Sequence, residues 1–328
     1  MLARIARQGN AGTFGGLGLG TGVLLVALGA ALWGTDGVLR VPLLREMSPA
    51  AIVLGEHVIL LLYSVPAVVL GWASLRRLRL SGWLALLVIG WGGSALATLL
   101  FTAAFVAGDP TVAILLQKVQ PLFAIVLAQI LLGERLRAAY WPLFAAAMVG
   151  AYLVSFGNLS PFAALGSEAA SGALLAVGAA ALWGSSTALG RFVLRDVPFH
   201  ALTGARLLLA VAPLAAIALA QDAFGDLGAG FVSQPVRLLL IALIPGLLGL
   251  LLYYRGLSTT RASHATLAEL AFPATAVALN WALLGVGVNA GQVVGFVLLW
   301  SAIYALGRLA DRTVQEDTLT EREERETA

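Results

Sequence analysis

Cysteine is absent from this chain, and charged residues are scarce. Only 11% of its 328 residues are Asp, Glu, Lys or Arg, whereas about a quarter of a soluble domain is charged. The lack of cysteine excludes disulfides, thiol catalysis and thiolate metal sites. The lack of charge excludes an ordinary soluble domain, because so few polar residues cannot cover a core of this size in water.

The motifs of common enzymes and pumps are missing as well. The three histidines are scattered, so the sequence predicts no metal site. There is no HExxH and no GxSxG, which argues against a membrane-embedded hydrolase, and no Walker A loop, which excludes a primary pump. We expect no cofactor. The net charge of +3 comes from arginines in short loops, so no nucleic-acid partner is predicted either.

Long apolar runs are what the chain does contain. Hydrophobic residues make up 60% of it, and ten segments reach the roughly 17–25 residues that cross a bilayer core of about 30 Å. Backbone groups must pair inside hydrocarbon, so these segments are predicted to be helices. They are residues 19–39, 50–72, 82–106, 111–132, 140–157, 171–190, 199–220, 236–256, 262–284 and 290–310. The predicted fold is an all-α integral membrane protein of ten transmembrane helices.

Arginine is distributed unevenly among the predicted loops. With the N-terminus inside, fifteen arginines fall on the cytoplasmic side and only Arg40, Arg45 and Arg237 fall outside. Cytoplasmic loops of membrane proteins carry such an excess of positive charge. The pattern predicts an N-in/C-in, multi-pass protein of a bacterial or archaeal cell membrane, with the lipid bilayer as its surroundings.

Two sequence patterns recur about 150 residues apart. The segment GAALWGT (29–35) returns as AAALWGS (179–185), and QPLFAIVLAQILLGE (120–134) aligns with FPATAVALNWALLGV (272–286). Each half therefore holds five predicted helices. Because five is odd, the second half enters the membrane inverted, which suits alternating access. Chance similarity between hydrophobic helices is the alternative interpretation.

The repeat divides the chain into five predicted parts. Two five-helix repeats cover most of it, and short segments precede, join and follow them. The tail is charged and poor in apolar residues, so we expect it to be disordered. The parts are an N-terminal cytoplasmic segment (1–18), the first repeat (19–157), a linker (158–170), the second repeat (171–310) and the tail (311–328).

These patterns carry a family resemblance. The Ala-rich Leu-Trp-Gly-Ser/Thr opening, the proline-bearing fourth helix and LLGERL (131–136) resemble the EamA repeat. Two such repeats are similar to the drug/metabolite transporter (DMT) superfamily. The resemblance implies export, or less often uptake, of small metabolites through a central cavity between the halves. The second helix departs from it, since it has His57 where such repeats often have arginine, a residue that the second half keeps as Arg206.

Five ionisable residues lie well inside predicted helices. A charge at the bilayer centre costs about 2.5–3.5 kcal/mol on insertion scales, so each one requires a reason. Excluding histidine, two are acidic and two are basic, a balance that suggests internal pairing or a cavity for zwitterions. The five are Glu56, His57, Lys118, Arg206 and Glu269.

Lys118 is the most informative of these residues. It lies about seven residues, or roughly 10 Å, into its helix and hence near the midplane. Pro121 removes the backbone hydrogen bond that Gln117 would accept, and Pro273 does the same for Glu269. Broken backbone at this depth is tolerated where protein or a cavity satisfies it. Both helices are therefore predicted to bend at the substrate site.

The predicted cavity combines residues of both halves. We expect Gln117, Lys118 and Gln120 to line it opposite Glu269. Trp33 and Trp183 start equivalent predicted bends and are candidate walls, although membrane tryptophans are more often packing residues or interface anchors. The alternative for Lys118 and Glu269 is a structural ion pair that holds helices together.

A second polar group lies nearer the predicted outer surface. Glu56 and His57 occupy in the second helix the place that Arg206 occupies in the seventh. Neighbouring residues of a helix point about 100° apart, so one of the pair can face the cavity while the other faces a helix. Proton coupling through either is one hypothesis, and a packing pair near the outer rim is the other. Arg206 is expected to be structural, bound to backbone carbonyls or a lipid headgroup.

Four polar residues near predicted helix ends are not expected to bind substrate. Glu134 is expected to form a loop ion pair or a gate-closing contact. Asp36 is expected to be exposed to water, and His200 and His264 to lie on the surface.

The function predicted from these features is secondary transport by alternating access through a central cavity. The predicted substrate is a small metabolite, either an amino acid or another zwitterion, moved by efflux, with protons as a possible coupling ion. Export of organic cations or drugs is the alternative, and a membrane-embedded enzyme is a further one. The sequence does not predict an oligomeric state.

Overall fold

The computed structural model describes residues 20–107, 116–156, 170–284 and 287–327. Every regular element in these ranges is helical. Eight helices in the described part of the chain are long and apolar enough to cross a membrane. Two shorter apolar helices, Gln120–Leu132 and Tyr140–Phe156, correspond to the fourth and fifth predicted segments. The chain is therefore an all-helical, multi-pass membrane protein.

The first half holds five of these segments in chain order. The first is broken after Trp33, the third contains a π-helix, and the fourth is described from Leu116 onward. Its elements are α1 (Thr21–Trp33), α2 (Asp36–Leu43), α3 (Pro49–Leu75), α4 (Leu80–Leu87), η2 (Val88–Leu96), α5 (Ala97–Ala107), α7 (Gln120–Leu132) and α8 (Tyr140–Phe156).

The second half has the same plan with one added helix, α11, which the sequence analysis did not predict. Its elements are α9 (Ala170–Val193), α10 (Phe199–Ala220), α11 (Phe224–Ser233), α12 (Pro235–Ile241), η5 (Ala242–Leu248), α13 (Gly249–Leu257), α14 (Ala262–Ala268), α15 (Ala271–Leu284) and α16 (Ala290–Thr327).

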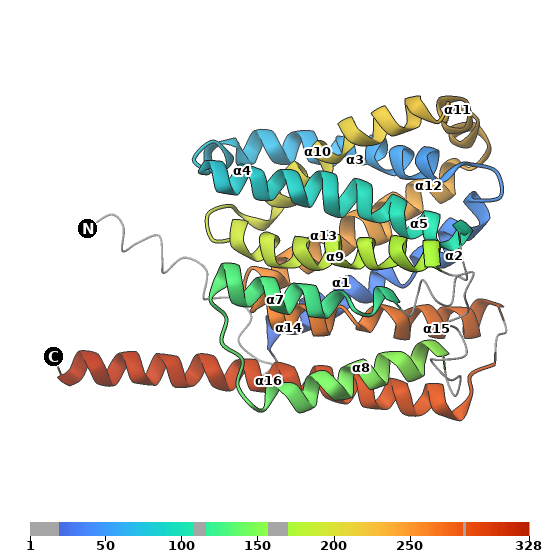
Figure 1. Cartoon of the computed structure of the whole chain (residues 1–328). Coiled ribbons are helices and arrows are strands. Elements are labelled where there is room, and N and C mark those ends of the chain that lie inside the picture. The colour runs from blue at the N-terminus through green and yellow to red at the C-terminus, as the bar shows by residue number, and fades with distance from the viewer. Residues whose placement is uncertain (1–19, 108–115, 157–169, 285–286, 328) are drawn as a thin grey trace.

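Helices of the two halves pack against one another in corresponding pairs. α3 packs on α10, and α8 packs on α16. α1 packs on α13, while α9 packs on η2 and α5. Figure 1 shows α8 and α16 along one side of the bundle and α3, α4 and α10 along the other, with α1, α7, α9 and α13 between them. The centre of the molecule is therefore formed by both halves.

Glycines permit the close approach of α1 and α13. A Cβ atom on Gly256 would lie 2.5 Å from the carbonyl oxygen of Gly22, and one on Gly29 would lie 2.7 Å from that of Gly249. The two contacts are seven residues apart on each helix. Their order is reversed between α1 and α13, so the two helices are antiparallel. Small residues let membrane helices pack backbone to backbone. This interface therefore requires glycine at these positions, since glycine has no side chain.

The expected bends are present at both prolines. The helix ending at Gln117 is separated from α7 by Lys118 and Val119, and α14 is separated from α15 by Glu269 and Leu270. Pro121 lies in the first turn of α7, where its missing N–H costs nothing. The π-helices η2 and η5 occupy similar places in the two halves, and such segments often mark functional sites.

The C-terminal tail differs from the expectation of disorder. α16 continues without interruption through residues 311–327. This stretch contains no Gly or Pro and is rich in Glu and Arg, which have high helix propensity. The low hydrophobicity of the tail means that it need not be buried. It does not prevent the tail from forming a helix. The predicted N-terminal segment (1–18) and residues 158–169 of the predicted linker (158–170) lie outside the described residues.

Candidate functional site

A small cavity lies where the two broken helices meet. It has a volume of about 40 Å³ and is lined by residues of both halves. This volume admits water but is far below the roughly 300–1,000 Å³ of typical small-molecule pockets. The lining residues are Trp33, Gln117, Lys118, Gln120, Pro121, Thr266, Glu269, Leu270 and Phe272.

Glu269 is the centre of a hydrogen-bond network beside this cavity. Its Oε1 accepts a hydrogen bond from Thr187 Oγ1 at 2.9 Å and another from the Tyr253 hydroxyl, also at 2.9 Å. Its Oε2 accepts from Gln120 Nε2 at 2.5 Å. The side chain is 5% exposed. Neutral donors from α7, α9 and α13 therefore satisfy this buried carboxylate.

Lys118 is buried without a comparable set of partners. Its Nζ lies 3.9 Å from the centroid of the Phe272 ring, a cation–π contact. Among the described residues it has no hydrogen-bond partner and no ion pair with Glu269. The hypothesis of a structural Lys118–Glu269 pair is therefore wrong for this conformation, because neutral groups already occupy the carboxylate.

The expected cavity residues are mostly brought together. Gln117, Lys118, Gln120, Glu269 and Trp33 all line the cavity, although substrate contact stays a prediction. Pro273 is buried in the first turn of α15.

Trp183 does not join the cavity-lining residues. Its Nε1 donates to the Gly93 carbonyl at 2.9 Å, and its ring packs on Phe101. The predicted bend after it is wrong, since α9 runs unbroken. The hydroxyls of Ser185 and Ser186 each bond the carbonyl four residues earlier and stay within the helix.

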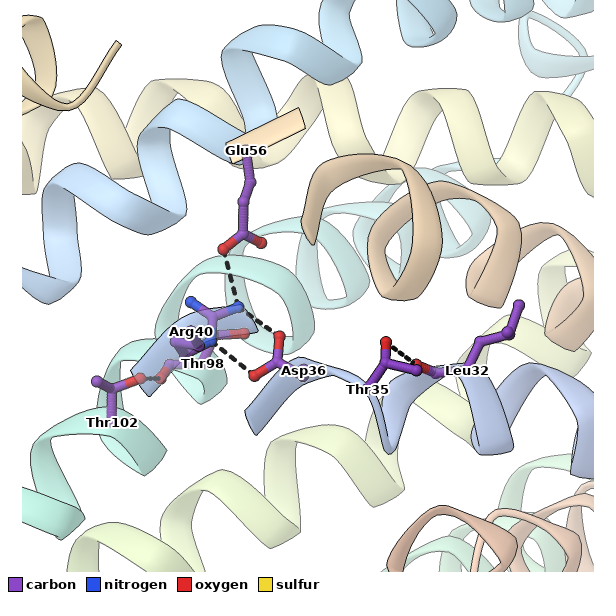
Figure 2. A network of polar contacts seen from close by, with 7 residues as sticks. All are labelled: Leu32, Thr35, Asp36, Arg40, Glu56, Thr98 and Thr102. Carbon is purple, nitrogen blue, oxygen red and sulfur yellow. Dashed lines mark hydrogen bonds and ion pairs between the residues drawn. The ribbon is translucent and has the colours of Figure 1, made fainter. Parts of the chain in front are cut away.

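A second polar network joins α2 to α3 (Figure 2). Arg40 donates to Asp36 at 2.7 and 2.8 Å, and its Nη2 lies 2.8 Å from Glu56 Oε1. The Arg40 side chain is 13% exposed and that of Glu56 10%. The expectation that Arg40 lies in an outer loop is therefore wrong, because Arg40 is part of α2. Asp36 is partly exposed, with 34% of its side chain accessible, but it is also paired with Arg40. The helix resumes after Gly34 and Thr35 as α2, which brings Arg40 within reach of Glu56 on α3.

His57 and Arg206 do not form a group with Glu56. His57 Nδ1 lies 2.8 Å from the Val53 carbonyl of its own helix. Arg206 donates to Ser94 Oγ at 2.6 Å and to the Tyr254 hydroxyl at 2.8 Å. A structural role for Arg206 fits these contacts, but its partners are side-chain hydroxyls rather than the expected carbonyls or lipid.

Glu134 joins the ends of the two broken helices. α7 ends at Gly133, whose φ of +67° is the left-handed conformation that glycine adopts readily. Glu134 follows directly and accepts hydrogen bonds from the Ala262 and Ser263 backbone amides and the Ser263 hydroxyl, at 2.8, 3.1 and 2.6 Å. The carboxylate thus caps α14 across the boundary between the halves, and we call this contact the Glu134 latch.

The two histidines expected on the surface have different environments. His200 is exposed, as predicted. His264 is 5% exposed and packs on the Tyr140 ring, with centroids 5.7 Å apart. The prediction for His264 is wrong because the Tyr140 hydroxyl donates to the Ser263 carbonyl at 2.7 Å and holds its ring over this helix end.

Several residues of the site were missed from the sequence. Thr187, Tyr253 and Thr266 contact Glu269 or line the cavity, and Tyr254 binds Arg206. Thr187 lies one turn after the repeated Trp-Gly-Ser motif, which was a usable signal. Thr266 lies seven residues, or about two turns, before Pro273. Nothing in the sequence indicated which face of α13 its tyrosines present.

The arrangement suits binding rather than covalent chemistry. Over the described residues, no group of three His, Asp or Glu side chains could hold a metal ion. What the two halves do provide is a buried carboxylate, a buried ammonium group and amide and hydroxyl groups around one small cavity. Such a site can bind a polar small molecule once the helices separate.

Comparison with known proteins agrees with this architecture. A riboflavin transporter of Fusobacterium nucleatum subsp. nucleatum, ImpX, is 30% identical over 292 residues, which cover 88% of this chain and 98% of that protein. A solved crystal structure has the same fold, with a TM-score of 0.65 at 18% identity over 89% of this chain and 97% of the other. The EamA-like transporter family matches residues 20–156 and 170–308, one repeat each. The chain therefore belongs to the EamA-like transporter family, within the drug/metabolite transporter superfamily.

Proposed function

We propose that this protein is a secondary transporter that moves a small polar metabolite by alternating access between two inverted repeats. One observation carries the proposal: the polar cavity lies at equivalent breaks in one helix of each repeat, next to prolines that interrupt the backbone. Broken helices that line a site between repeats are the usual arrangement in secondary transporters.

The size and closure of the cavity support a cycle of opening and closing. At about 40 Å³ it has to widen before a metabolite can enter. The Glu134 latch joins the repeats at the end of the bundle where α7 ends and α14 begins. At the opposite end, Glu46 accepts hydrogen bonds from Ser233 and Gln234 of the second repeat. Alternating access requires each end to open in turn.

The proposed topology has ten crossings with both termini in the cytoplasm. Eight helices are long enough to cross alone, and the two shorter apolar helices complete five per repeat. The arginine asymmetry supports this orientation, and the proposed position of the Glu134 latch is therefore the cytoplasmic side. A bacterial or archaeal cell membrane remains the proposed location.

Riboflavin, or a flavin of similar shape, is the first candidate substrate. A relative at 30% identity is named a riboflavin transporter, and the two chains match over almost their full lengths. The cavity combines the aromatic side chains of Trp33 and Phe272 with amide and hydroxyl groups. This mixture suits a flat heteroaromatic molecule with polar edges.

An amino acid or another zwitterion is the second candidate. One observation favours it, because Lys118 and Glu269 line the same cavity with opposite charges and do not pair with each other. Organic cations are less suited, since the ammonium group of Lys118 would repel them.

The test is transport by purified protein in liposomes. Riboflavin, a set of amino acids and an organic cation are each offered on one side, and flux is followed with and without a proton gradient. Saturable riboflavin flux supports the first candidate, and saturable amino-acid flux the second. Oriented vesicles report the direction, for which efflux is the proposal. Absence of saturable flux for every compound, in protein that is folded and inserted, would contradict the proposal of a metabolite transporter.

A further inference from the structure

We propose that Gln117 and Lys118 read a substrate edge on which carbonyl oxygens flank an N–H group, as in the imide of the flavin ring system. The inference rests on the proposed transport of a flavin and names the residues that would select it. It is carried by buried polar atoms that have no hydrogen-bond partner among the described residues and that belong to residues lining the cavity.

Lys118 supplies the first of these atoms. Its Nζ is buried and has no hydrogen-bond acceptor among the described residues, and the side chain as a whole is 4% exposed. In that part of the chain, the ammonium group lies over the face of the Phe272 ring. A buried ammonium group without an acceptor is costly, so a substrate carbonyl that approaches Nζ would relieve a real deficit.

Gln117 supplies the complementary atom. Its Oε1 is a buried acceptor with no donor among the described residues, and the Thr266 hydroxyl, which also lines the cavity, has no partner there either. Leaving such groups unpaired costs about 1–3 kcal/mol each. The cavity thus presents an unused acceptor and an unused cation from neighbouring residues.

The break in the helix is what allows both residues to face the cavity. Consecutive side chains of a regular helix point about 100° apart, so a continuous helix would turn one of them away. Here the helix ends at Gln117 and α7 begins at Gln120. Lys118 lies in the turn between them, and both side chains line the cavity.

A flavin imide matches this pair in order and in kind. Its N3–H would donate to Gln117 Oε1, and an adjacent carbonyl oxygen would accept from Lys118 Nζ. An α-amino acid could meet the same two atoms, but its ammonium group would find Glu269 already bonded to Gln120, Thr187 and Tyr253. The Trp33 ring lines the cavity and can stack on a flat ring system. An amino-acid backbone has no need of such an aromatic wall.

The decisive test changes the ligand and leaves the protein intact. Riboflavin uptake into proteoliposomes is competed with 3-methylriboflavin, which lacks the N3–H, and with a flavin altered only at the opposite, dimethylbenzene edge. We expect the 3-methyl compound to compete about tenfold or more less effectively than riboflavin, because a buried acceptor is left unpaired. The flavin altered at the far edge should compete within about threefold, since Gln117 and Lys118 do not meet that edge.

Two variants test whether Gln117 and Lys118 cause the preference for riboflavin over 3-methylriboflavin. Gln117→Leu should reduce the preference for riboflavin over 3-methylriboflavin to about twofold or less, because the acceptor is gone. Lys118→Met, which is close in length and suited to hydrocarbon, should weaken both flavins by a similar factor and keep the preference. Ser155→Ala, which removes a hydroxyl bonded only to its own helix in α8, serves as the control for handling and insertion.

The outcomes separate the inference from the proposed function. Equal competition by riboflavin and 3-methylriboflavin in the wild type, or an undiminished preference in a folded Gln117→Leu variant, would overturn the imide assignment while leaving flavin transport intact. If the wild type moves no flavin but does move amino acids, the flavin substrate and the imide assignment fall together. The assignment of the chain as a metabolite transporter survives that result.

Discussion

The carboxylate of Glu134 lies 2.6 Å from the hydroxyl oxygen of Ser263, and thereby joins the end of one broken helix to the start of the other. These two helices come from different repeats and line the same cavity. A latch in this position has to release whenever the cavity opens at its own end of the bundle. Under the proposed alternating access, it is a contact that the transport cycle makes and breaks.

Removal of the latch should more often open its end of the bundle, which is proposed to be the cytoplasmic one. Glu134→Ala eliminates three hydrogen bonds to a carboxylate, and such bonds contribute about 1.5–3 kcal/mol each. The chain has no cysteine, so Thr266→Cys provides a unique thiol in the cavity. We expect Glu134→Ala to raise the labelling rate of this thiol from the cytoplasmic side by at least about tenfold.

Glu46→Ala is the matched control for this experiment. Glu46 also bonds residues of the second repeat, but at the other end of the bundle and with an exposed side chain. It should not raise cytoplasmic labelling of Thr266→Cys, because any added opening would be at the other end. Equal labelling rates with and without Glu134 would show that the contact does not limit access.

The Arg40–Glu56 pair should behave as a buried ion pair. Arg40→Met leaves Glu56 without its cation and Asp36 without its partner, and breaking such a pair costs about 3–5 kcal/mol. We expect a clear fall in the thermal unfolding temperature in detergent. The double variant Arg40→Met, Glu56→Met should recover most of the loss, because no unpaired buried carboxylate remains at the α2–α3 contact. A double variant no more stable than Arg40→Met would argue against the pairing.

The α1–α13 interface should not tolerate a side chain at Gly256. Even a Cβ there would approach the Gly22 carbonyl to 2.5 Å and the Val26 nitrogen to 2.7 Å, both of which are backbone atoms. Gly256→Val should cost at least about 1–3 kcal/mol and reduce the monodisperse fraction in size-exclusion chromatography. Gly37→Ala is the control. A Cβ atom at Gly37 has no neighbouring atom within 4 Å, and alanine favours a helix, so this variant should be as stable as the wild type or slightly more stable.

Glu269 should respond differently to amide and apolar replacements. Glu269→Gln keeps an acceptor for the Thr187 and Tyr253 hydroxyls, whereas Glu269→Leu leaves the Gln120 amide group without its acceptor. In the Leu variant Thr187 can donate only to the Trp183 carbonyl, at 3.3 Å, and Tyr253 only to the Thr187 hydroxyl. Each unsatisfied buried donor costs about 1–3 kcal/mol, so the Leu variant should unfold at a clearly lower temperature than the Gln variant. Similar unfolding temperatures for the two variants would mean that the network contributes little to stability.

The helices and their breaks were predictable from the sequence. All described helices that match the ten predicted segments begin or end within a few residues of the expected positions, because hydropathy reports directly on burial in lipid. Pro121 and Pro273 marked the breaks, since proline removes a backbone donor wherever it lies in a helix. These two features sufficed to place Lys118 and Glu269 in one cavity.

The partners of the polar residues were not predictable in the same way. Arg40 was counted as a loop residue, because the sequence does not show that the helix resumes beyond Gly34 and Thr35. The contacts of Glu134 with Ser263 and of Arg206 with Tyr254 join residues 129 and 48 positions apart. Such pairs depend on how helices rotate about their axes, and apolar faces that are nearly uniform around a membrane helix do not reveal that rotation.

The Glu134 latch also bears on the history of the two halves. In the repeat alignment that pairs Pro121 with Pro273, the first-half residue corresponding to Ala262 is Pro110. Ala262 provides a backbone N–H to the carboxylate, and proline has none to provide. A pair of identical first halves could not build this contact in full. The two repeats have become chemically distinct at their ends, and their fusion in one polypeptide ensures that each always meets its complement.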